Sequence, residues 1–261
     1  MKRGLILLFV TMFAGQVWAY ESFTDHGWEY DIIDEENHYV RLIRAYNTDV
    51  KATIGQAVNN KTSTLYTVTE IGDDAFGGCD RFVKITIYNT VTSIGHNAFN
   101  NCSALASVTI GNSVTTIGDC AFQNCSVLKS ISIPDSVTSI GQNAFKNCIG
   151  LTSVIIPNSV ESIEDNAFFC CEELSSITLP NSIKHIKESA FAGCLSLTSI
   201  TIPNSVQSIG NGAFYYCANL TSVNIENQKT EIDENAFRGC TQIDSKIIPQ
   251  WMTEPDDTPM W

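Results

Sequence analysis

Cysteine is the reactive residue that this sequence repeats, and its spacing decides what chemistry it could do. Eight of the ten cysteines recur every 23 residues, at Cys79, Cys102, Cys125, Cys148, Cys171, Cys194, Cys217 and Cys240. A thiol can form a disulfide, bind a metal ion as thiolate or pack as a small apolar group. Metal binding is disfavoured because the sequence has no Cys-x-x-Cys pair and no histidine cluster to join the cysteines.

Disulfides along the row of cysteines are also disfavoured. Equivalent cysteines of stacked repeats would lie about 4.8 Å apart, but their side chains would point the same way, against the torsion of about 90° that a disulfide adopts. We therefore expect buried thiols rather than disulfides. The other two cysteines are out of register: Cys120 stands where other repeats carry Asn or Asp, and Cys170 directly precedes Cys171. One of these could be exposed and open to oxidation, but a bridge between them is not expected, because they occupy different positions two repeats apart.

The remaining titratable residues form no catalytic pattern. The histidines (His26, His38, His96 and His185) are scattered and belong to no GxSxG or HExxH string. Acid pairs that precede some Ala-Phe pairs, as in Asp73-Asp74, Glu164-Asp165 and Asp233-Glu234, predict a solvated rim in preference to a calcium or catalytic site. The sequence thus predicts no enzyme, with no catalytic residues, bound metal or cofactor.

The cysteines belong to a longer repeat. The string Ala-Phe-x-x-Cys occurs eight times without insertion or deletion, with its rings at Phe76, Phe99, Phe122, Phe145, Phe168, Phe191, Phe214 and Phe237. Alternating apolar residues such as Ile131 and Ile133 follow each cysteine, and this alternation predicts a strand. Identical strands stacked in register pair in parallel. Because so short a unit cannot bury its apolar side alone, the repeats predict a solenoid whose phenylalanines stack in the core.

A turn follows each predicted strand. Proline shares one register in four units, at Pro134, Pro157, Pro180 and Pro203. Pairs such as Val137 and Ile140 then return the chain to the core. Glycine follows this Ile in five of the eight units, at Gly72, Gly95, Gly118, Gly141 and Gly210. We expect a positive φ at these glycines, although Glu164, Lys187 and Asp233 stand in the same register.

The unit CxxLxxIxIPxSVxxIGxxAFxx resembles the leucine-rich repeats of the BspA-like surface antigens. The resemblance extends from about Thr67 to Ile248. It implies a leucine-rich-repeat solenoid, mostly β, with a parallel strand ladder on one side and turns or short helical segments on the other. It also implies a β-hairpin cap at the N-terminal end and a surface or secreted binding module, with adhesion to host or neighbouring-cell proteins.

Outside the repeats we predict a leader, a cap and a tail. Residues 1–19 read as a signal peptide, with a basic pair, an apolar run and a cut after Ala19. Residues 20–66 contain two alternating runs separated by polar residues, which predict the hairpin cap. Residues 67–249 form the solenoid of about eight repeats, and residues 250–261 a flexible tail in which Trp251 could fold back as a lid. We expect an exported chain, secreted, periplasmic or at the cell surface, with no transmembrane segment in its mature form.

The charge limits the choice of partners. The chain carries 15 Lys and Arg against 28 Asp and Glu, a formal net charge of −13. This balance disfavours nucleic acid, because phosphate backbones are bound by clustered Lys and Arg.

The outward positions of the predicted strands form the candidate binding surface. Side chains of a strand alternate between its two sides, so two parallel columns of small polar residues should face solvent. We call this surface the strand face: Lys84, Thr86, Ser107, Thr109, Ser130, Ser132, Ser153, Ile155, Ser176, Thr178, Ser199, Thr201, Ser222 and Asn224.

The strand face has two interpretations. Ser and Thr suit any exposed strand, but a flat, uncharged, hydrogen-bonding surface also suits a large protein partner, with Ile155 as a candidate contact. We favour an extracellular or cell-surface protein as the partner. The alternatives are a glycan-binding module, for which only Tyr215 and Tyr216 approach an exposed aromatic row, and a purely structural envelope protein.

Overall fold

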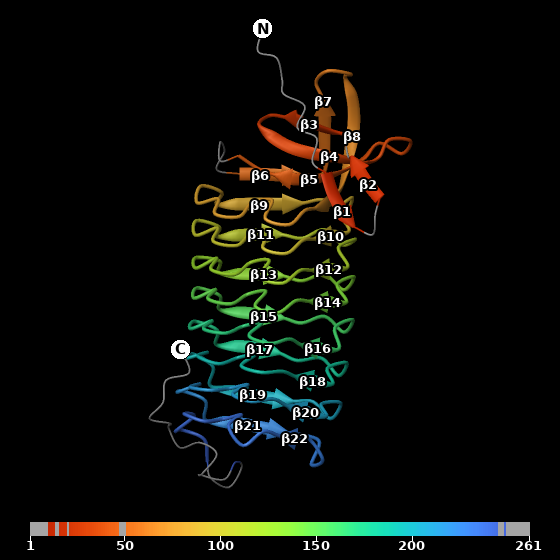
Figure 1. The fold of residues 1–261 in the computed structure, drawn as a ribbon. Coiled ribbons are helices and arrows are strands. Elements are labelled where there is room, and N and C mark those ends of the chain that lie inside the picture. Colours follow the sequence, from red (N-terminus) through yellow and green to blue (C-terminus); the bar gives the residue numbers. More distant parts are fainter. Residues whose placement is uncertain (1–9, 14–15, 20, 47–50, 245–247, 249–261) are drawn as a thin grey trace.

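The structure, a computed structural model, describes residues 10–13, 16–19, 21–46, 51–244 and 248. Among them the chain forms a β-solenoid in which each 23-residue turn, here called a coil, stacks on the one before (Figure 1). The eight core phenylalanines from Phe76 to Phe237 are separated by seven such intervals, so the solenoid has about seven turns. The segments between strands are turns, and no helix occurs in the described part of the chain.

Two parallel ladders of strands run along the solenoid. The first ladder consists of β6 (Lys51–Ile54), β9 (Lys84–Ile87), β11 (Ser107–Thr109), β13 (Ser130–Ser132), β15 (Ser153–Ile155) and β17 (Ser176–Thr178), and it continues as a separate pair, β19 (Ser199–Ile202) and β21 (Ser222–Ile225). The second ladder consists of β8 (Thr64–Ile71), β10 (Ser93–Ile94), β12 (Thr116–Ile117), β14 (Ser139–Ile140), β16 (Ser162–Ile163), β18 (His185–Ile186), β20 (Ser208–Ile209) and β22 (Glu231–Ile232). The predicted strand of each repeat is the first ladder, and the parallel pairing is confirmed.

Antiparallel strands cap the solenoid at the β8 end (Figure 1). They are β3 (Ser22–Asp25), β4 (Trp28–Asp34), β5 (Tyr39–Arg44) and β7 (Gln56–Asn59). The predicted hairpin is confirmed, because β4 pairs antiparallel with β5, which then pairs in parallel with β8. The indole of Trp28 meets the ring of Phe76 edge-on at 5.5 Å between centroids, so the cap covers the end of the phenylalanine column.

The predicted leader and tail lie largely outside the described residues. Within the leader, β1 (Val10–Phe13) pairs antiparallel with β2 (Gln16–Ala19). All of the tail, including Trp251, lies outside the described part. No helix in that part is long and apolar enough to cross a membrane.

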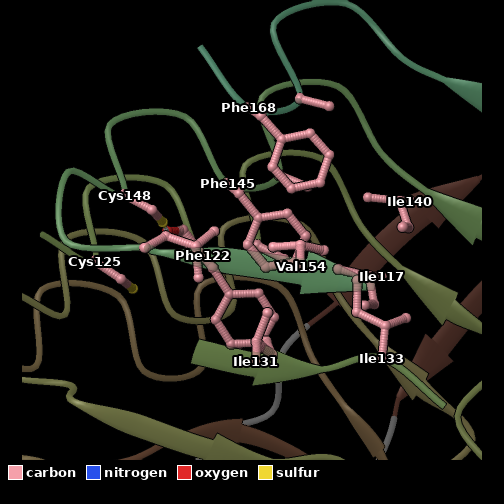
Figure 2. Close-up of a cluster of buried hydrophobic side chains, with 14 of the residues drawn as sticks. Ile117, Phe122, Cys125, Ile131, Ile133, Ile140, Phe145, Cys148, Val154 and Phe168 are labelled. Carbon is pink, nitrogen blue, oxygen red and sulfur yellow. Dashed lines mark hydrogen bonds between the residues drawn. The ribbon is translucent and has the colours of Figure 1, made fainter. Parts of the chain in front are cut away.

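Stacked phenylalanines fill the core, as predicted (Figure 2). Ring centroids of neighbouring coils lie 4.8 to 5.5 Å apart, with planes within 22° of parallel. Each of the eight rings is fully buried. Offset stacking of this kind contributes beyond the burial of apolar area, so the column provides apolar volume that the small side chains of the repeat lack.

The expectation of a positive φ at the recurring glycines is wrong. None of Gly72, Gly95, Gly118, Gly141 and Gly210 is left-handed. Close approach between coils explains them instead: a Cβ on Gly118 would lie 2.7 Å from the carbonyl carbon of Gly95. The left-handed residues stand before Ala-Phe and before the ladder cysteine, as at Asn97 and Asn101.

The second ladder is interrupted where this glycine register changes. Strand pairing runs unbroken from β8 to β14 and again from β16 to β22, but β14 does not pair with β16. Gly141 follows β14, and Glu164 takes the same position after β16. The break coincides with the first larger side chain in this register, but the strands that precede Lys187 and Asp233 remain paired, so a larger side chain is not by itself enough to open the ladder.

Candidate functional site

The structure places the predicted strand face on one side of the first ladder. Its residues pair across neighbouring strands in strict register, for example Ser153 with Ser130 and with Ser176. Twelve of the fourteen are exposed, and Thr86 and Ser107 are half-buried. The core residues that alternate with them, such as Val154, are buried, so the predicted alternation holds along the ladder.

Ile155 is the most exposed large apolar side chain among the described residues, at 73%. It stands between Ser132 and Thr178 on the neighbouring strands, in the middle of the ladder. Removing such a side chain from water stabilises a complex, because burial of apolar area contributes about 25 cal/mol per Å². Its position at the centre of a polar surface is typical of a contact residue surrounded by hydrogen-bonding groups.

The strand face continues into the cap, which the sequence analysis missed. Strand β6 pairs with β9, so that Lys51 aligns with Lys84 and Thr53 with Thr86. Both Lys51 and Thr53 are exposed. The face therefore has a cationic end made of two neighbouring lysines. Residues 51–54 do not follow the 23-residue repeat, so no periodic signal in the sequence indicates this extension.

A second surface, also missed, lies on the second ladder. Its strands present an outward column made of Glu70, Ser93, Thr116, Ser139, Ser162, His185, Ser208 and Glu231. Beside this column, the glycine register leaves a groove of about 570 Å³ that extends over the coils from Gly72 to Gly141. The regular polar residue before each core isoleucine was the signal that could have revealed it.

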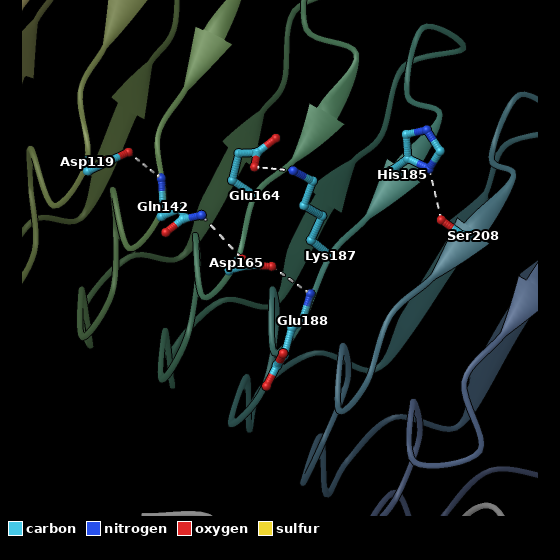
Figure 3. Close-up of polar contacts among 8 residues, drawn as sticks. All are labelled: Asp119, Gln142, Glu164, Asp165, His185, Lys187, Glu188 and Ser208. Atoms are coloured by element: carbon cyan, nitrogen blue, oxygen red, sulfur yellow. Dashed lines mark hydrogen bonds and ion pairs between the residues drawn. The ribbon is translucent and has the colours of Figure 1, made fainter.

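Ion pairs mark the two ends of this groove. At the cap, the guanidinium of Arg41 donates to the Glu70 carboxylate, with 2.6 Å between Nε and Oε2. Beyond Gly141 the register holds Glu164 and then Lys187, whose Nζ lies 2.6 Å from Oε2 of Glu164 (Figure 3). This hydrogen bond raises the pKa of the Lys187 ammonium. The paired side chains take the positions that glycine leaves empty in the earlier coils.

Carboxylates along the rim are used to join coils. Asp73, Asp119 and Asp165 each accept a hydrogen bond from the backbone N–H of the residue 23 positions later, at 2.7, 2.9 and 3.1 Å. Figure 3 shows two of these contacts, from Gln142 to Asp119 and from Glu188 to Asp165. In the described residues, no group of three His, Cys, Asp or Glu side chains could hold a metal ion. The rim therefore contributes to stacking as well as to solubility.

The histidines are also held by the stacking of coils. Nδ1 of His96 accepts from the backbone N–H of Asp119 at 3.1 Å. Nδ1 of His185 lies 2.9 Å from the hydroxyl oxygen of Ser208 in the next coil (Figure 3). Both partners stand 23 residues later, at the matching position of the neighbouring coil, so the contacts of these two histidines follow from the repeat.

The ladder cysteines are buried thiols, in agreement with the sequence. Each Sγ from Cys102 to Cys240 donates to the carbonyl oxygen of the phenylalanine 26 residues earlier, at 3.0 to 3.4 Å, as from Cys148 to Phe122. The first thiol, Cys79, donates instead to the cap residue Ala45 at 3.6 Å. Burial raises the pKa of Cys148 to about 12. Thiols held protonated in this way are poor nucleophiles, because the thiolate is the reactive form.

The two off-register cysteines occupy left-handed positions. Cys120 has φ 56° and Cys170 has φ 53°, in registers that most other coils fill with Asn or Gly. Both are half-buried free thiols. Burial raises the pKa of both. They are the most accessible cysteines of the described chain, and neither belongs to a described group of three side chains that could hold a metal ion.

The aromatic pair singled out in the sequence does not form an exposed row. Tyr215 is buried at 2% exposure, whereas Tyr216 is 37% exposed and left-handed. A more exposed ring is Tyr88, at 52%, which the sequence analysis passed over. It stands in the register that later coils fill with proline, so a tyrosine in place of proline was the signal in the sequence.

Two parallel ladders, turns in place of helices and long polar faces define a β-solenoid repeat protein. The BspA type leucine rich repeat region, in six copies, matches residues 57–175 and 161–257. The chain therefore belongs to the BspA-type leucine-rich-repeat family. None of the curated proteins matches it.

Solved structures share this fold. A leucine-rich repeat protein from Bacteroides ovatus is 30% identical, with a TM-score of 0.57 over 85% of this chain and 70% of that chain. The T. pallidum leucine rich repeat protein TpLRR is 24% identical, with a TM-score of 0.67 over 90% of this chain and 98% of that chain. A leucine rich cell surface protein from Faecalibacterium prausnitzii is 25% identical, with a TM-score of 0.47 over 85% of this chain and 87% of that chain.

Proposed function

We propose that this chain is an exported, non-enzymatic protein-binding module that acts at a cell surface or after secretion and binds its partner through the strand face. The observation that carries the proposal is the strand face itself: twelve exposed residues in register along one ladder, with Ile155 projecting from the middle. Repeat proteins bind large partners through such extended surfaces.

The chemistry of the remaining groups supports a binding role over catalysis. The rim carboxylates accept backbone hydrogen bonds, and burial raises the pKa of the ladder thiols, such as Cys102 and Cys148. Groups committed to stacking in this way are not free to act as general acids, bases or nucleophiles. Export rests on the predicted signal peptide, and N-terminal sequencing of the exported protein tests it by the expected new terminus at Tyr20.

The test of the strand face begins with affinity capture against extracellular matrix and plasma proteins, followed by titration of each captured protein. In a triple variant, Thr109, Ile155 and Thr178 are replaced by Lys. A matched control places three lysines on the side of the second ladder, at Thr116 and Ser139 on its strands and at Gln142 just after β14, which are also exposed. Both variants change the net charge equally, so non-specific electrostatic effects should be the same in each.

We expect the strand-face variant to weaken binding by at least about tenfold and the control to change it by less than about threefold. Unchanged binding by the strand-face variant would remove the assignment of this face. A loss in the control variant alone would move the interface to the second ladder. If no extracellular protein is captured, the purely structural role becomes the better explanation.

A further inference from the structure

At one end of the strand face, the residue that follows the first-ladder strand differs in type from its equivalents in the later coils. Pro134, Pro157, Pro180 and Pro203 occupy this register farther along, whereas Tyr88 and Gly111 stand there in the first two regular coils. Tyr88 lies two residues after Thr86, so its side chain leaves the ladder on the strand-face side. The ring is 52% exposed although it lies against the solenoid.

The backbone of the cap holds the Tyr88 ring in place. A Cβ on Gly55 would lie 2.6 Å from Cδ2 of Tyr88, so the ring occupies the space that a side chain at Gly55 would need. The N–H of Tyr88 donates to the carbonyl of Ile54 at 2.9 Å, and its own carbonyl accepts from Val91 at 3.1 Å. The backbone of Tyr88 is thus held by hydrogen bonds and its side chain packs against Gly55, which limits the conformational freedom that is lost when a ligand stacks on the ring.

A hollow opens beside this platform. It has a volume of about 520 Å³ and lies over Gly111, bordered by Tyr88, Asn89 and Asn112 and by the strand-face residues Thr86 and Thr109. A Cβ on Gly111 would lie 2.5 Å from the carbonyl oxygen of Tyr88, so these neighbouring coils approach too closely for a side chain at this position. The Asn89 amide oxygen accepts from the N–H of Asn112 at 2.8 Å, which fixes the orientation of that amide.

The lining of the hollow combines one aromatic ring and two isoleucines, Ile87 and Ile110, with hydroxyl and amide groups, and it contains no charged residue. This neutrality is notable in a chain of net charge −13. A pyranose ring has a side of C–H groups whose positive hydrogens match the negative face of an aromatic ring. Its rim of hydroxyls matches neutral amides and hydroxyls, which can both donate and accept. A shallow, open hollow also suits a terminal sugar better than a buried cofactor.

We propose that the hollow between Tyr88 and Gly111 is a subsite for a neutral pyranose of a surface glycan, stacked on the Tyr88 ring. It adds a ligand class to the proposed protein-binding role and does not depend on it, because Tyr88 and Gly111 lie outside the triplet that tests the strand face and only Thr109 is common to both. A glycan carried by the protein partner would engage both surfaces at once.

The test is a titration of the full chain by NMR with the methyl pyranosides of glucose, galactose and mannose, observed by saturation transfer. Tyr88→Leu keeps apolar volume but removes the aromatic face, and Tyr88→Phe keeps the face and removes the hydroxyl. Tyr39→Leu is the matched control, because Tyr39 is an exposed tyrosine of the cap at 41%. A proline hexapeptide serves as a competing probe, since aromatic grooves also bind proline-rich segments. Circular dichroism with urea confirms that each variant is folded.

We expect at least one pyranoside to bind, Tyr88→Leu to weaken it by about tenfold or more, and Tyr88→Phe and Tyr39→Leu to change it by less than about threefold. The proposal is overturned if no pyranoside binds or if Tyr88→Leu binds the pyranoside as tightly as the unchanged chain does. It is also overturned if Tyr39→Leu loses as much pyranoside affinity as Tyr88→Leu. Tighter binding of the proline peptide at Tyr88 would assign the hollow to peptide recognition instead. A variant with only Ile155 and Thr178 replaced by Lys leaves the lining of the hollow unchanged. Loss of protein capture in that variant with intact sugar binding would separate the two activities.

Discussion

Replacing Gly118 by alanine tests the conclusion that close approach of coils, and not a left-handed turn, determines the glycine register. The new Cβ would lie 2.7 Å from the carbonyl carbon and 2.8 Å from the carbonyl oxygen of Gly95. Carbon atoms attract best at about 3.5–4.0 Å, so the two coils must separate by several tenths of an ångström or more. The N–H of Gly118 donates to Ile94 at 2.9 Å in the same place, and separation would lengthen this bond.

We expect Gly118→Ala to lower the free energy of unfolding by about 1–3 kcal/mol, the usual cost of forcing extra atoms into a packed contact. Where a glycine has room and a compatible backbone, the same change stabilises by about 0.4–1 kcal/mol, because alanine restricts the unfolded chain. The two interpretations therefore differ in sign. Urea denaturation followed by far-ultraviolet circular dichroism measures the difference, with the slope checked for two-state behaviour.

Two further variants make this result decisive. Gly210→Ala places its Cβ 3.0 Å from the carbonyl carbon of Lys187, a looser contact, so its loss should be smaller. Gly118→Asn should be at least as harmful as Gly118→Ala, whereas a left-handed position would accept Asn better than Ala. An unchanged or higher stability for Gly118→Ala, or a tolerated Gly118→Asn, would refute the reasoning.

Three other predictions concern the core and the thiols. Phe145→Ala removes a fully buried ring stacked on Phe122 and Phe168 at 5.5 and 5.3 Å, and urea denaturation should show a loss of about 3–5 kcal/mol; a loss near zero would mean that the column contributes little. Burial raises the pKa of Cys148 to about 12, whereas a thiol in the unfolded chain has a pKa of about 8.5. The protonated Cys148 thiol therefore contributes its full stabilisation of the folded chain below the unfolded pKa. Above that pH the contribution falls by about 1.4 kcal/mol per pH unit. Between about pH 7 and 10 the urea midpoint should therefore fall less steeply with pH for Cys148→Ala than for the unchanged chain. Equal slopes would contradict the raised pKa of Cys148. A maleimide should label Cys120 and Cys170 before Cys148 in the native chain, as peptide mass spectrometry can show; equal labelling rates would place the ladder thiols at the surface.

Much of the solenoid could be predicted because the repeat has no insertion. Once Phe122, Cys125 and Ile131 recur at a fixed interval, stacking places each on its own equivalents, so the core follows from periodicity alone. The strand face could be predicted for the same reason, since alternation about Val154 decides which neighbours face solvent.

Alternation alone could not predict the second ladder, although the polar residue before each core isoleucine recurs in every coil. Its strands, such as β12 and β14, are two residues long, too short for alternation to distinguish a strand from a turn. The glycine register was misassigned because glycine is favoured both by a left-handed backbone and by close approach, and a sequence does not separate the two causes. Tyr88 was missed because it breaks a pattern, and the extension at Lys51 because it lies outside the repeat.

The backbone hydrogen bonds between coils all run along the axis of the solenoid, and this direction has a mechanical consequence. A pull on the two ends would load these bonds in series, so that rupture needs only the force that opens one coil at a time. Each released coil of 23 residues would lengthen the chain by roughly 70–80 Å, because an extended residue spans about 3.3–3.6 Å. Under tension between two surfaces the protein would therefore unfold coil by coil and dissipate work at a nearly constant low force. The extended chain would be several times longer than the folded rod.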